Sequence, residues 1–176
     1  MDPAGTLEAM AQVSVTLAGF SGLVVAFRTG SASTLDRWLP RERLIFWLLL
    51  VATFSALFFS LLPLALLAFA LAEELVWRSS SLLLGVFLAS ALGAAVRANL
   101  RLTQEGHPSV IPRVWAAGVT LSASGVLLEL ANGLGLFAVR SFGVYLLGPL
   151  LLLGMGCLMF VAFLIYPSRR SSSREE

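Results

Sequence analysis

The chain has 176 residues, of which 58% are hydrophobic and 12% are charged, and its mean hydropathy is +0.89. A water-soluble domain carries about a quarter of its residues as charges, so this composition excludes one and indicates a surface that faces lipid. The net charge of +2 comes from twelve arginines and ten acidic residues. The arginines are spread over several loops, which argues against nucleic-acid binding.

Five apolar segments follow one another, and each approaches or exceeds the roughly 20 residues that a helix needs to cross the hydrocarbon core. Helices are expected because lipid offers no hydrogen bonds to backbone groups. The predicted fold is all-α, a polytopic transmembrane helical bundle in one domain, residues 7–166. Residues 1–6 form a short tail, and the Ser- and Arg-rich residues 167–176 are expected to be disordered. The predicted helices cover residues 7–27, 44–72, 82–100, 114–137 and 142–166.

The first segment is polar for a membrane span, since Gln12, Ser14, Thr16 and Ser21 interrupt its apolar residues. It could lie in the membrane interface instead of crossing the bilayer. It does not resemble a cleaved signal peptide, because the first seven residues include Asp2 and no cation. We therefore expect this segment to remain in the mature protein.

The distribution of arginine predicts the orientation. With five spans, ten arginines fall on one side, and the other side holds Arg78 and Arg140. Cytoplasmic loops carry the excess of cations, so the N-terminus is predicted outside and the C-terminus inside. The last four helices would keep this orientation even if the first did not cross; the acidic Asp2 and Glu8 favour an outer N-terminus. The ten arginines are Arg28, Arg37, Arg41, Arg43, Arg97, Arg101, Arg113, Arg169, Arg170 and Arg174.

The second segment, residues 44–72, would be about 43 Å long as a straight helix, which exceeds the thickness of the hydrocarbon core. Tilt, an interfacial first turn or a kink at Pro63 can absorb the excess. Aromatic residues near the predicted segment ends are typical of the belt at headgroup level. These residues are Trp38, Trp47, Trp77, Trp115, Tyr145 and Tyr166.

Small residues at four-residue spacing predict the faces through which the helices pack, because membrane helices associate where their backbones approach closely. The pattern leaves open whether the contacts lie within one chain or between copies. The first helix has Ser14, Ala18, Gly22 and Ala26, the third has Gly85, Ala89 and Gly93, and the fourth has Gly118 and Ser122.

Two helices also carry polar stripes. The first has Glu8, Gln12, Thr16 and Gly19, and the fourth has Ser122, Gly125, Glu129 and Asn132. In the five-span topology the two stripes reach similar depth in the outer half of the membrane, so we expect them to meet. The candidate intramembrane polar site is therefore Glu129, Asn132, Gln12, Thr16 and Ser122.

Glu129 is the most unusual residue, because an acid inside the bilayer is costly and should face a partner or water. It could be an ion or proton site. It could instead be a structural acid paired with Arg140, Gln12 or a backbone group, which is the interpretation we favour. Asn132 is expected to hydrogen-bond between helices.

No residue pattern predicts catalysis. His107 has no Cys, Asp or second His near it in the chain, so no metal site is expected. There is no Gly-rich phosphate loop and no hydrolase motif. Cys157 lies in an apolar run and is expected to face lipid or another helix. We predict no catalytic, cofactor-binding or metal-binding residue, and no enzymatic activity.

Three stretches of the chain carry a resemblance: LAGFSGLVVAF at 17–27, LELANGLG at 128–135 and YLLGPLLLLGMGCLMF at 145–160. Together they resemble a set of small uncharacterised bacterial inner-membrane proteins with an AGF-G first helix and an L-x-x-N-x-x-G motif. The resemblance implies a bacterial plasma membrane and transfers no activity. Glu129 stands where such sequences often have another residue.

These observations predict a non-enzymatic interaction or accessory protein of the cell membrane. Its expected partners are the lipid bilayer and either a second copy or another membrane protein. The alternative is an oligomeric ion channel or pore lined by the polar face of the first or the fourth helix, a class that includes effector pores opened by a soluble partner. A lipid-modifying enzyme is a more distant third possibility.

Overall fold

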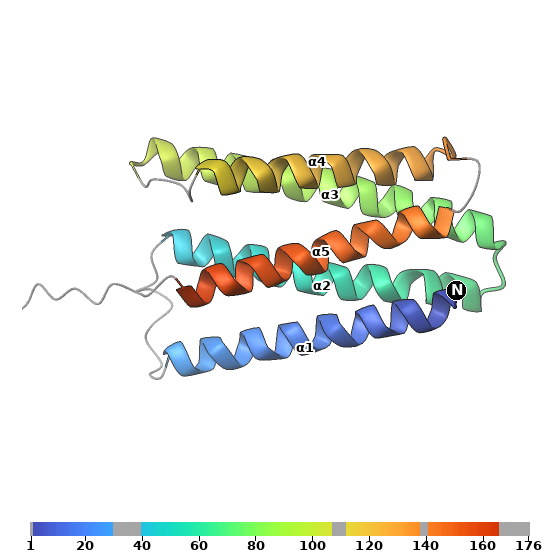
Figure 1. The fold of residues 1–176 in the computed structure, drawn as a ribbon, viewed down its shortest axis with the longest axis horizontal. Helices are drawn as coiled ribbons and strands as arrows, with labels where there is room; N and C mark the ends of the chain where they lie inside the picture. The colour runs from blue at the N-terminus through green and yellow to red at the C-terminus, as the bar shows by residue number, and fades with distance from the viewer. Residues whose placement is uncertain (1, 30–39, 107–111, 138–140, 166–176) are drawn as a thin grey trace, which may run out of the picture.

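The computed structural model describes residues 2–29, 40–106, 112–137 and 141–165. These residues form five helices that run alternately in opposite directions (Figure 1). The helices are α1 (Pro3–Thr29), α2 (Pro40–Ala68), α3 (Glu73–Gln104), α4 (Pro112–Gly133) and α5 (Ser141–Ile165). We call the end of the bundle where α2 begins the Arg43 end, and the end where α3 begins the Arg78 end. Arg97 and Arg101, near the end of α3, belong to the Arg43 end.

The expected membrane helical bundle is confirmed in its coarse form. Four helices are long and apolar enough to cross a bilayer, and α4 is not among them in the part of the chain described. The first segment, whose polar residues left its span in question, is one of the four. The candidate spans are Pro3–Val24, Glu42–Ala68, Glu73–Gln104 and Phe142–Leu164.

Several helix boundaries differ from those predicted. α3 begins at Glu73 instead of residue 82, because the polar residues of its first turns form helix outside the most apolar stretch. Glu73 and Glu74 suit the positive end of the helix dipole, and Glu74 pairs with Arg78 at 2.6 Å. α2 ends at Ala68, before Ala70, which has a positive φ of 56°. α1 takes in residues 3–6, which were expected to form a tail, and Asp2 accepts a hydrogen bond from the Ala4 N–H at 3.1 Å.

The end of α4 also lies earlier than predicted, at Gly133 rather than at residue 137. The chain reverses at Gly135, which has a φ of +74°. The N–H of Leu136 bonds to the carbonyl of Ala131, and the N–H of Gly135 bonds to that of Asn132. This is the Schellman arrangement, and glycine suits it because it lacks the Cβ that disfavours a positive φ. The predicted tail at 167–176 lies outside the described residues.

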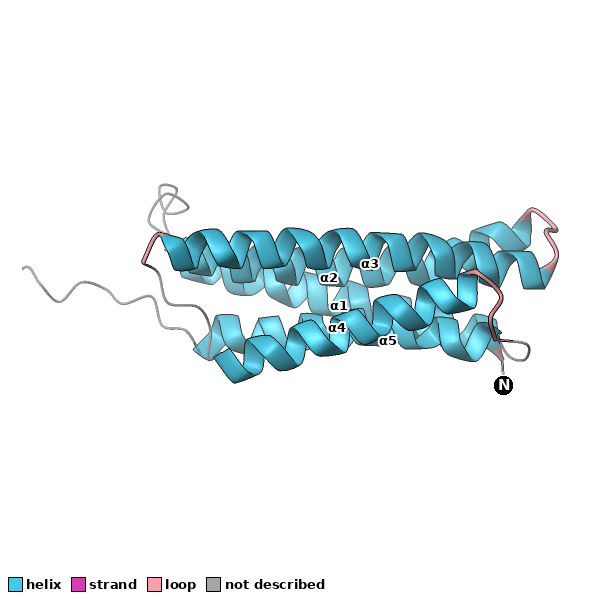
Figure 2. Ribbon diagram, turned by 90° about the horizontal axis from the view of Figure 1, so that it is seen from above, coloured by secondary structure: helices cyan, strands magenta, loops and turns pink. Residues whose placement is uncertain are grey.

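The helices form two groups. α3 packs along α4, and α2 packs along both α5 and α1, with fewer contacts between the groups. α1 lies on the side of α2 and α5 that is remote from α4 (Figure 1). Between the two groups, α2 contacts α3, and α5 contacts both α3 and α4; seen from above, α2 lies on the same side of the bundle as α3, and α5 lies on the same side as α4 (Figure 2).

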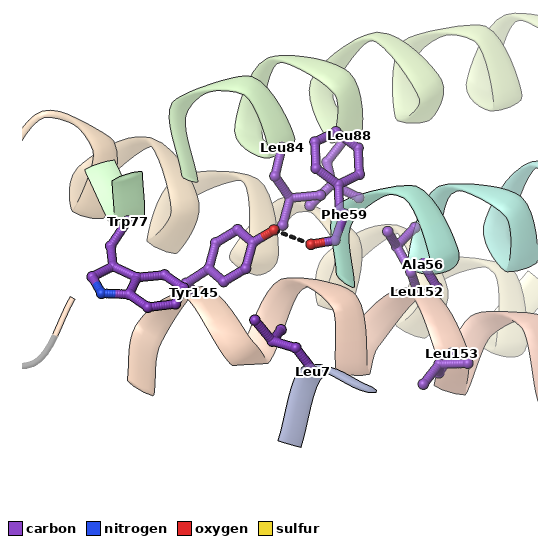
Figure 3. Packing of buried hydrophobic residues seen from close by; sticks show 9 residues of the cluster. All are labelled: Leu7, Ala56, Phe59, Trp77, Leu84, Leu88, Tyr145, Leu152 and Leu153. Atoms are coloured by element: carbon purple, nitrogen blue, oxygen red, sulfur yellow. Dashed lines mark hydrogen bonds between the residues drawn. The ribbon is translucent and has the colours of Figure 1, made fainter. Parts of the chain in front are cut away.

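A cluster of buried side chains joins the two groups (Figure 3). Within it the Trp77 ring lies 4.8 Å from the ring of Phe142 and 6.0 Å from that of Tyr145, measured between centroids. The predicted aromatic belt is therefore wrong for Trp77 and Tyr145, which are 5% and 0% exposed. Trp47, in contrast, is exposed near the start of α2. The cluster consists of Leu7, Ala56, Phe59, Trp77, Leu84, Leu88, Tyr145, Leu152 and Leu153.

Tyr145 also supplies a hydrogen-bond donor that α2 lacks. Pro63 lies inside this helix and has no N–H, so the carbonyl of Phe59, four residues earlier, lacks its helical donor. The Tyr145 hydroxyl donates a hydrogen bond to that carbonyl (Figure 3). An unpaired carbonyl is costly in a membrane interior, so this contact binds α5 to α2 at the point where α2 needs a donor.

Candidate intramembrane polar site

The α3–α4 contact depends on two glycines. A Cβ built on Gly133 would lie 2.8 Å from the backbone nitrogen of Leu82, and one on Gly85 would lie 2.8 Å from Leu130 Cδ2. Such approaches exclude any larger residue unless a neighbour moves. Gly85, one of the residues predicted to pack, therefore lies in a true interhelical contact, and short polar side chains at this interface come within bonding reach.

Asn132 and Ser81 make the interhelical hydrogen bond of this contact. Asn132 Nδ2 donates to Ser81 Oγ at 2.7 Å, and both residues are buried. The bond joins α4 to α3 and is the role expected of Asn132. A paired amide in hydrocarbon avoids the cost of leaving polar atoms unsatisfied.

Glu129 lies one turn before Asn132 and is completely buried. Neither carboxyl oxygen has a hydrogen-bond partner among the residues that the structure describes. The side chain lies against Gly148 of α5, where a built Cβ would be 2.6 Å from Glu129 Oε1. Glu129 thus fills the space left by a glycine at the junction of α3, α4 and α5. A buried, unsatisfied carboxyl is rare in a folded protein and marks this position as unusual.

A second proline accompanies this position. Pro149 lies inside α5, so the carbonyl of Tyr145 lacks the N–H that would normally reach it from residue 149. Tyr145 and Gly148 are three residues apart and share one face of α5. Tyr145 therefore lies on the face of α5 that Glu129 contacts. Glu129, Asn132 and Ser81 together form the polar site inside the bundle.

The expected meeting of the two polar stripes is wrong. Gln12 and Thr16 are exposed on α1, and the Thr16 hydroxyl bonds only to the backbone carbonyl of Gln12, at 2.8 Å. Glu129 is buried, and its helix α4 lies on the other side of α5 from α1 (Figure 1). Gln12 is therefore not the partner of Glu129, and Arg140, the other partner considered, lies outside the described residues. The outward direction of Gln12 and Thr16 on α1 was not predicted.

The small-residue stripe of α1 does not form a single contact face. Ser14 is buried, Ala18 is half-buried, and Gly22 and Ala26 are exposed. Residues four apart advance by about 40° more than one turn, so a stripe at this spacing winds around the helix. Its first member packs inside the bundle and its last members face outwards.

The remaining predicted residues are divided between different surfaces. Ala89 is exposed and Gly93 is half-buried on α3. Gly118 faces Met155 of α5, with 3.9 Å between a built Cβ and Met155 Cε. Ser122 lines an apolar groove near the Arg43 end, away from Asn132. The pairing of Ser81 with Asn132 was not predicted, because the third helix was expected to begin at residue 82, after Ser81.

Groups that could carry metal or thiol chemistry are sparse. The described ranges contain no cluster of three or more His, Cys, Asp or Glu side chains that could hold a metal ion. Cys157 is exposed on α5. His107 lies outside the described residues.

Comparison of the chain with protein-family models, with curated proteins and with solved structures found no match.

Proposed function

We propose that this protein is a five-span protein of the bacterial inner membrane that acts by assembling with a second copy of itself, and that it is not an enzyme. α3 and α5 run in the same direction, so the chain between them must return across the bundle, which supports a span by α4. The described Arg43, Arg97 and Arg101 at one end, against Arg78 at the other, support an outer N-terminus and an inner C-terminus. The resemblance to small inner-membrane proteins supports the location.

The proposal rests on the outward face of α1. Glu8, Gln12 and Thr16 are exposed on successive turns of a helix that qualifies as a membrane span. The side-chain amide of Gln12 has no hydrogen bond within the described chain. Polar groups that face hydrocarbon are costly, so this face requires a partner.

A second copy suits this face for two reasons. An amide both donates and accepts, so Gln12 can pair with the same residue of another chain across a two-fold axis. Around Gly19 and Gly22 a built Cβ would meet nothing within 4 Å. Their bare backbone allows another helix to approach closely, as at small-residue contacts in membranes.

Cysteine cross-linking in native membranes tests the proposed interface. Cys157→Ala removes the single cysteine, and Thr16→Cys then places a thiol on the outward face of α1. Val86→Cys, on an exposed position of α3, is the matched control. We expect an oxidised dimer from Thr16→Cys alone. Gln12→Leu should weaken association about 5- to 30-fold, the equivalent of about 1–2 kcal/mol for an interhelical hydrogen bond. Equal cross-linking of the two cysteines, or no dimer from Thr16→Cys, would contradict the proposal.

A pore is the second candidate, because the same three polar residues would line a central path if more than two copies surrounded it. The fourth helix is a poor candidate for such a lining, since Glu129 is buried within its own chain. Purified protein in liposomes distinguishes the two. Ion flux that is lost in Gln12→Leu favours the pore, and dimers without flux favour the interaction role.

A further inference from the structure

The Glu129 carboxyl of α4 contacts α5 next to a proline that interrupts the hydrogen bonding of that helix. Pro149 has no N–H, so the carbonyl of Tyr145, four residues earlier, lacks its helical donor. The carboxyl lies against Gly148, where a built Cβ would be 2.6 Å from Oε1 and 3.0 Å from the carboxyl carbon. The acid therefore meets α5 within one turn of the residue whose carbonyl needs a donor.

An oxygen beside the Cβ of a helical residue can bond to the carbonyl three residues earlier. Gly148 has no side chain, so the Glu129 oxygen from α4 takes the place beside its Cβ position. The carbonyl three residues before Gly148 is that of Tyr145. This protein contains three hydroxyls that make such bonds within their own helices, those of Thr53, Ser79 and Ser90, which bond to the carbonyls of Leu50, Val76 and Phe87 at 3.1, 3.2 and 2.7 Å.

The surroundings of Glu129 favour a carboxyl that donates a hydrogen bond. The side chain is completely buried, and no group in the described part of the chain donates to either of its oxygens. An ionised carboxylate only accepts hydrogen bonds, whereas a protonated one also donates. The groups that act on it are uncharged: the Ser81 hydroxyl from α3, and the Gly148 backbone and the titratable Tyr145 hydroxyl from α5. A charge at this position would be uncompensated, so the carboxyl should retain its proton.

We propose that the protonated carboxyl of Glu129 donates a hydrogen bond to the backbone carbonyl of Tyr145, so that α4 docks on α5 through this proton. The bond is the counterpart of the one that the Tyr145 hydroxyl makes to the Phe59 carbonyl, which Pro63 deprives of its donor. Loss of the proton removes the donor and leaves a buried charge where α3, α4 and α5 meet, so the docking of α4 depends on protonation. The inference is independent of the proposed assembly through α1.

Infrared spectroscopy of the full-length protein in liposomes at neutral pH tests for the proton. A protonated carboxyl has a C=O stretching band that an ionised one lacks. The difference spectrum between the wild type and Glu129→Gln should contain this band. The difference spectrum for Glu73→Gln, which changes an exposed acid, should not. Absence of the band from the Glu129→Gln difference would overturn the proposal.

Isotope labelling tests the acceptor. The chain has two tyrosines, Tyr145 and Tyr166, so Tyr166→Phe leaves a single carbonyl to be labelled with isotopic tyrosine. Glu129→Leu in this background removes the donor and should shift the labelled amide band to higher frequency. Glu129→Gln keeps an N–H donor and should shift it less. An unchanged band in Glu129→Leu would show that Tyr145 is not the acceptor.

A double-mutant cycle with Pro149→Ala measures the strength of the bond. Pro149→Ala restores a backbone N–H to the Tyr145 carbonyl, so Glu129→Leu should then cost less. In detergent micelles Glu129→Leu should lower the folding equilibrium constant about 3- to 20-fold more with Pro149 than without it, the equivalent of about 0.6–1.7 kcal/mol. Pro63→Ala is the matched control and should leave the cost of Glu129→Leu unchanged. Additive effects of Glu129→Leu and Pro149→Ala would overturn the proposal.

Discussion

The hydroxyl of Tyr145 on α5 donates a hydrogen bond to the carbonyl of Phe59 on α2, the carbonyl that Pro63 deprives of its helical donor. Two helices that are far apart in the chain are therefore joined at a built-in gap in the hydrogen bonding of one of them. The bond lies in the buried cluster that links the two groups of helices, so it contributes to holding α2 and α5 together (Figure 3).

This relationship predicts a specific coupling between Tyr145 and Pro63. Tyr145→Phe should lower the free energy of unfolding by about 1–3 kcal/mol, because it leaves a buried carbonyl unsatisfied. In a Pro63→Ala background the carbonyl regains a backbone N–H, and the same change should cost much less. Unfolding of the four proteins in detergent micelles measures the coupling. Additive effects would show that the hydroxyl has another role.

These residues show how much of the structure could be predicted from the sequence. The apolar runs predicted five helices, and Pro63 was recognised as a point where the second could kink. That Tyr145 supplies the missing donor could not be read, because it depends on which helix lies beside which. The same limit explains Gln12 and Glu129. Their depth follows from counting residues along a helix, whereas their neighbours depend on the order of helices in the bundle. Ser81 was missed because polar residues at the start of α3 hid the true beginning of that helix.

Glu129 should tolerate replacement by a neutral side chain of the same shape and should not tolerate replacement by a cation. Glu129→Gln keeps the shape of the side chain and breaks no hydrogen bond or ion pair that the structure describes, so we expect a change in unfolding free energy below about 1 kcal/mol. Glu129→Lys places an uncompensated cation in the same space and should prevent folding or cost more than about 3 kcal/mol. Thermal unfolding with Glu73→Gln as an exposed control measures both. A large loss of unfolding free energy in Glu129→Gln would show that the carboxyl group binds a further partner, which favours an ion or proton site.

Gly148 should be sensitive to a single added methyl group. A Cβ there would collide with Leu84 and lie 2.6 Å from Glu129 Oε1, and overpacking of this kind costs about 1–3 kcal/mol. Gly154 lies on the same helix, and a built Cβ meets nothing within 4 Å. Gly148→Ala should therefore lower the midpoint of thermal unfolding, and Gly154→Ala should leave it unchanged or raise it. The opposite order would contradict the packing of α5 against α3 and α4.

The α3–α4 bond predicts a smaller effect. Ser81→Ala removes the acceptor of the Asn132 amide, and interhelical hydrogen bonds in membranes contribute about 0.6–1.7 kcal/mol. Ser90→Ala, on an exposed part of the same helix, removes a hydroxyl that bonds only within α3 and is the control. Denaturant titration should resolve a loss for Ser81→Ala alone. Equal values for the two variants would indicate that Asn132 finds another acceptor.

The central claim is that the outward face of α1 joins copies of this protein, and the mass of the native particle tests it most directly. Full-length protein extracted in a mild detergent and weighed by native mass spectrometry should contain more than one chain. Gln12→Leu should shift it towards the monomer, whereas Val86→Leu, on the exposed face of α3, should not. A wild-type protein that is monomeric at every concentration and in every detergent tested would contradict the claim.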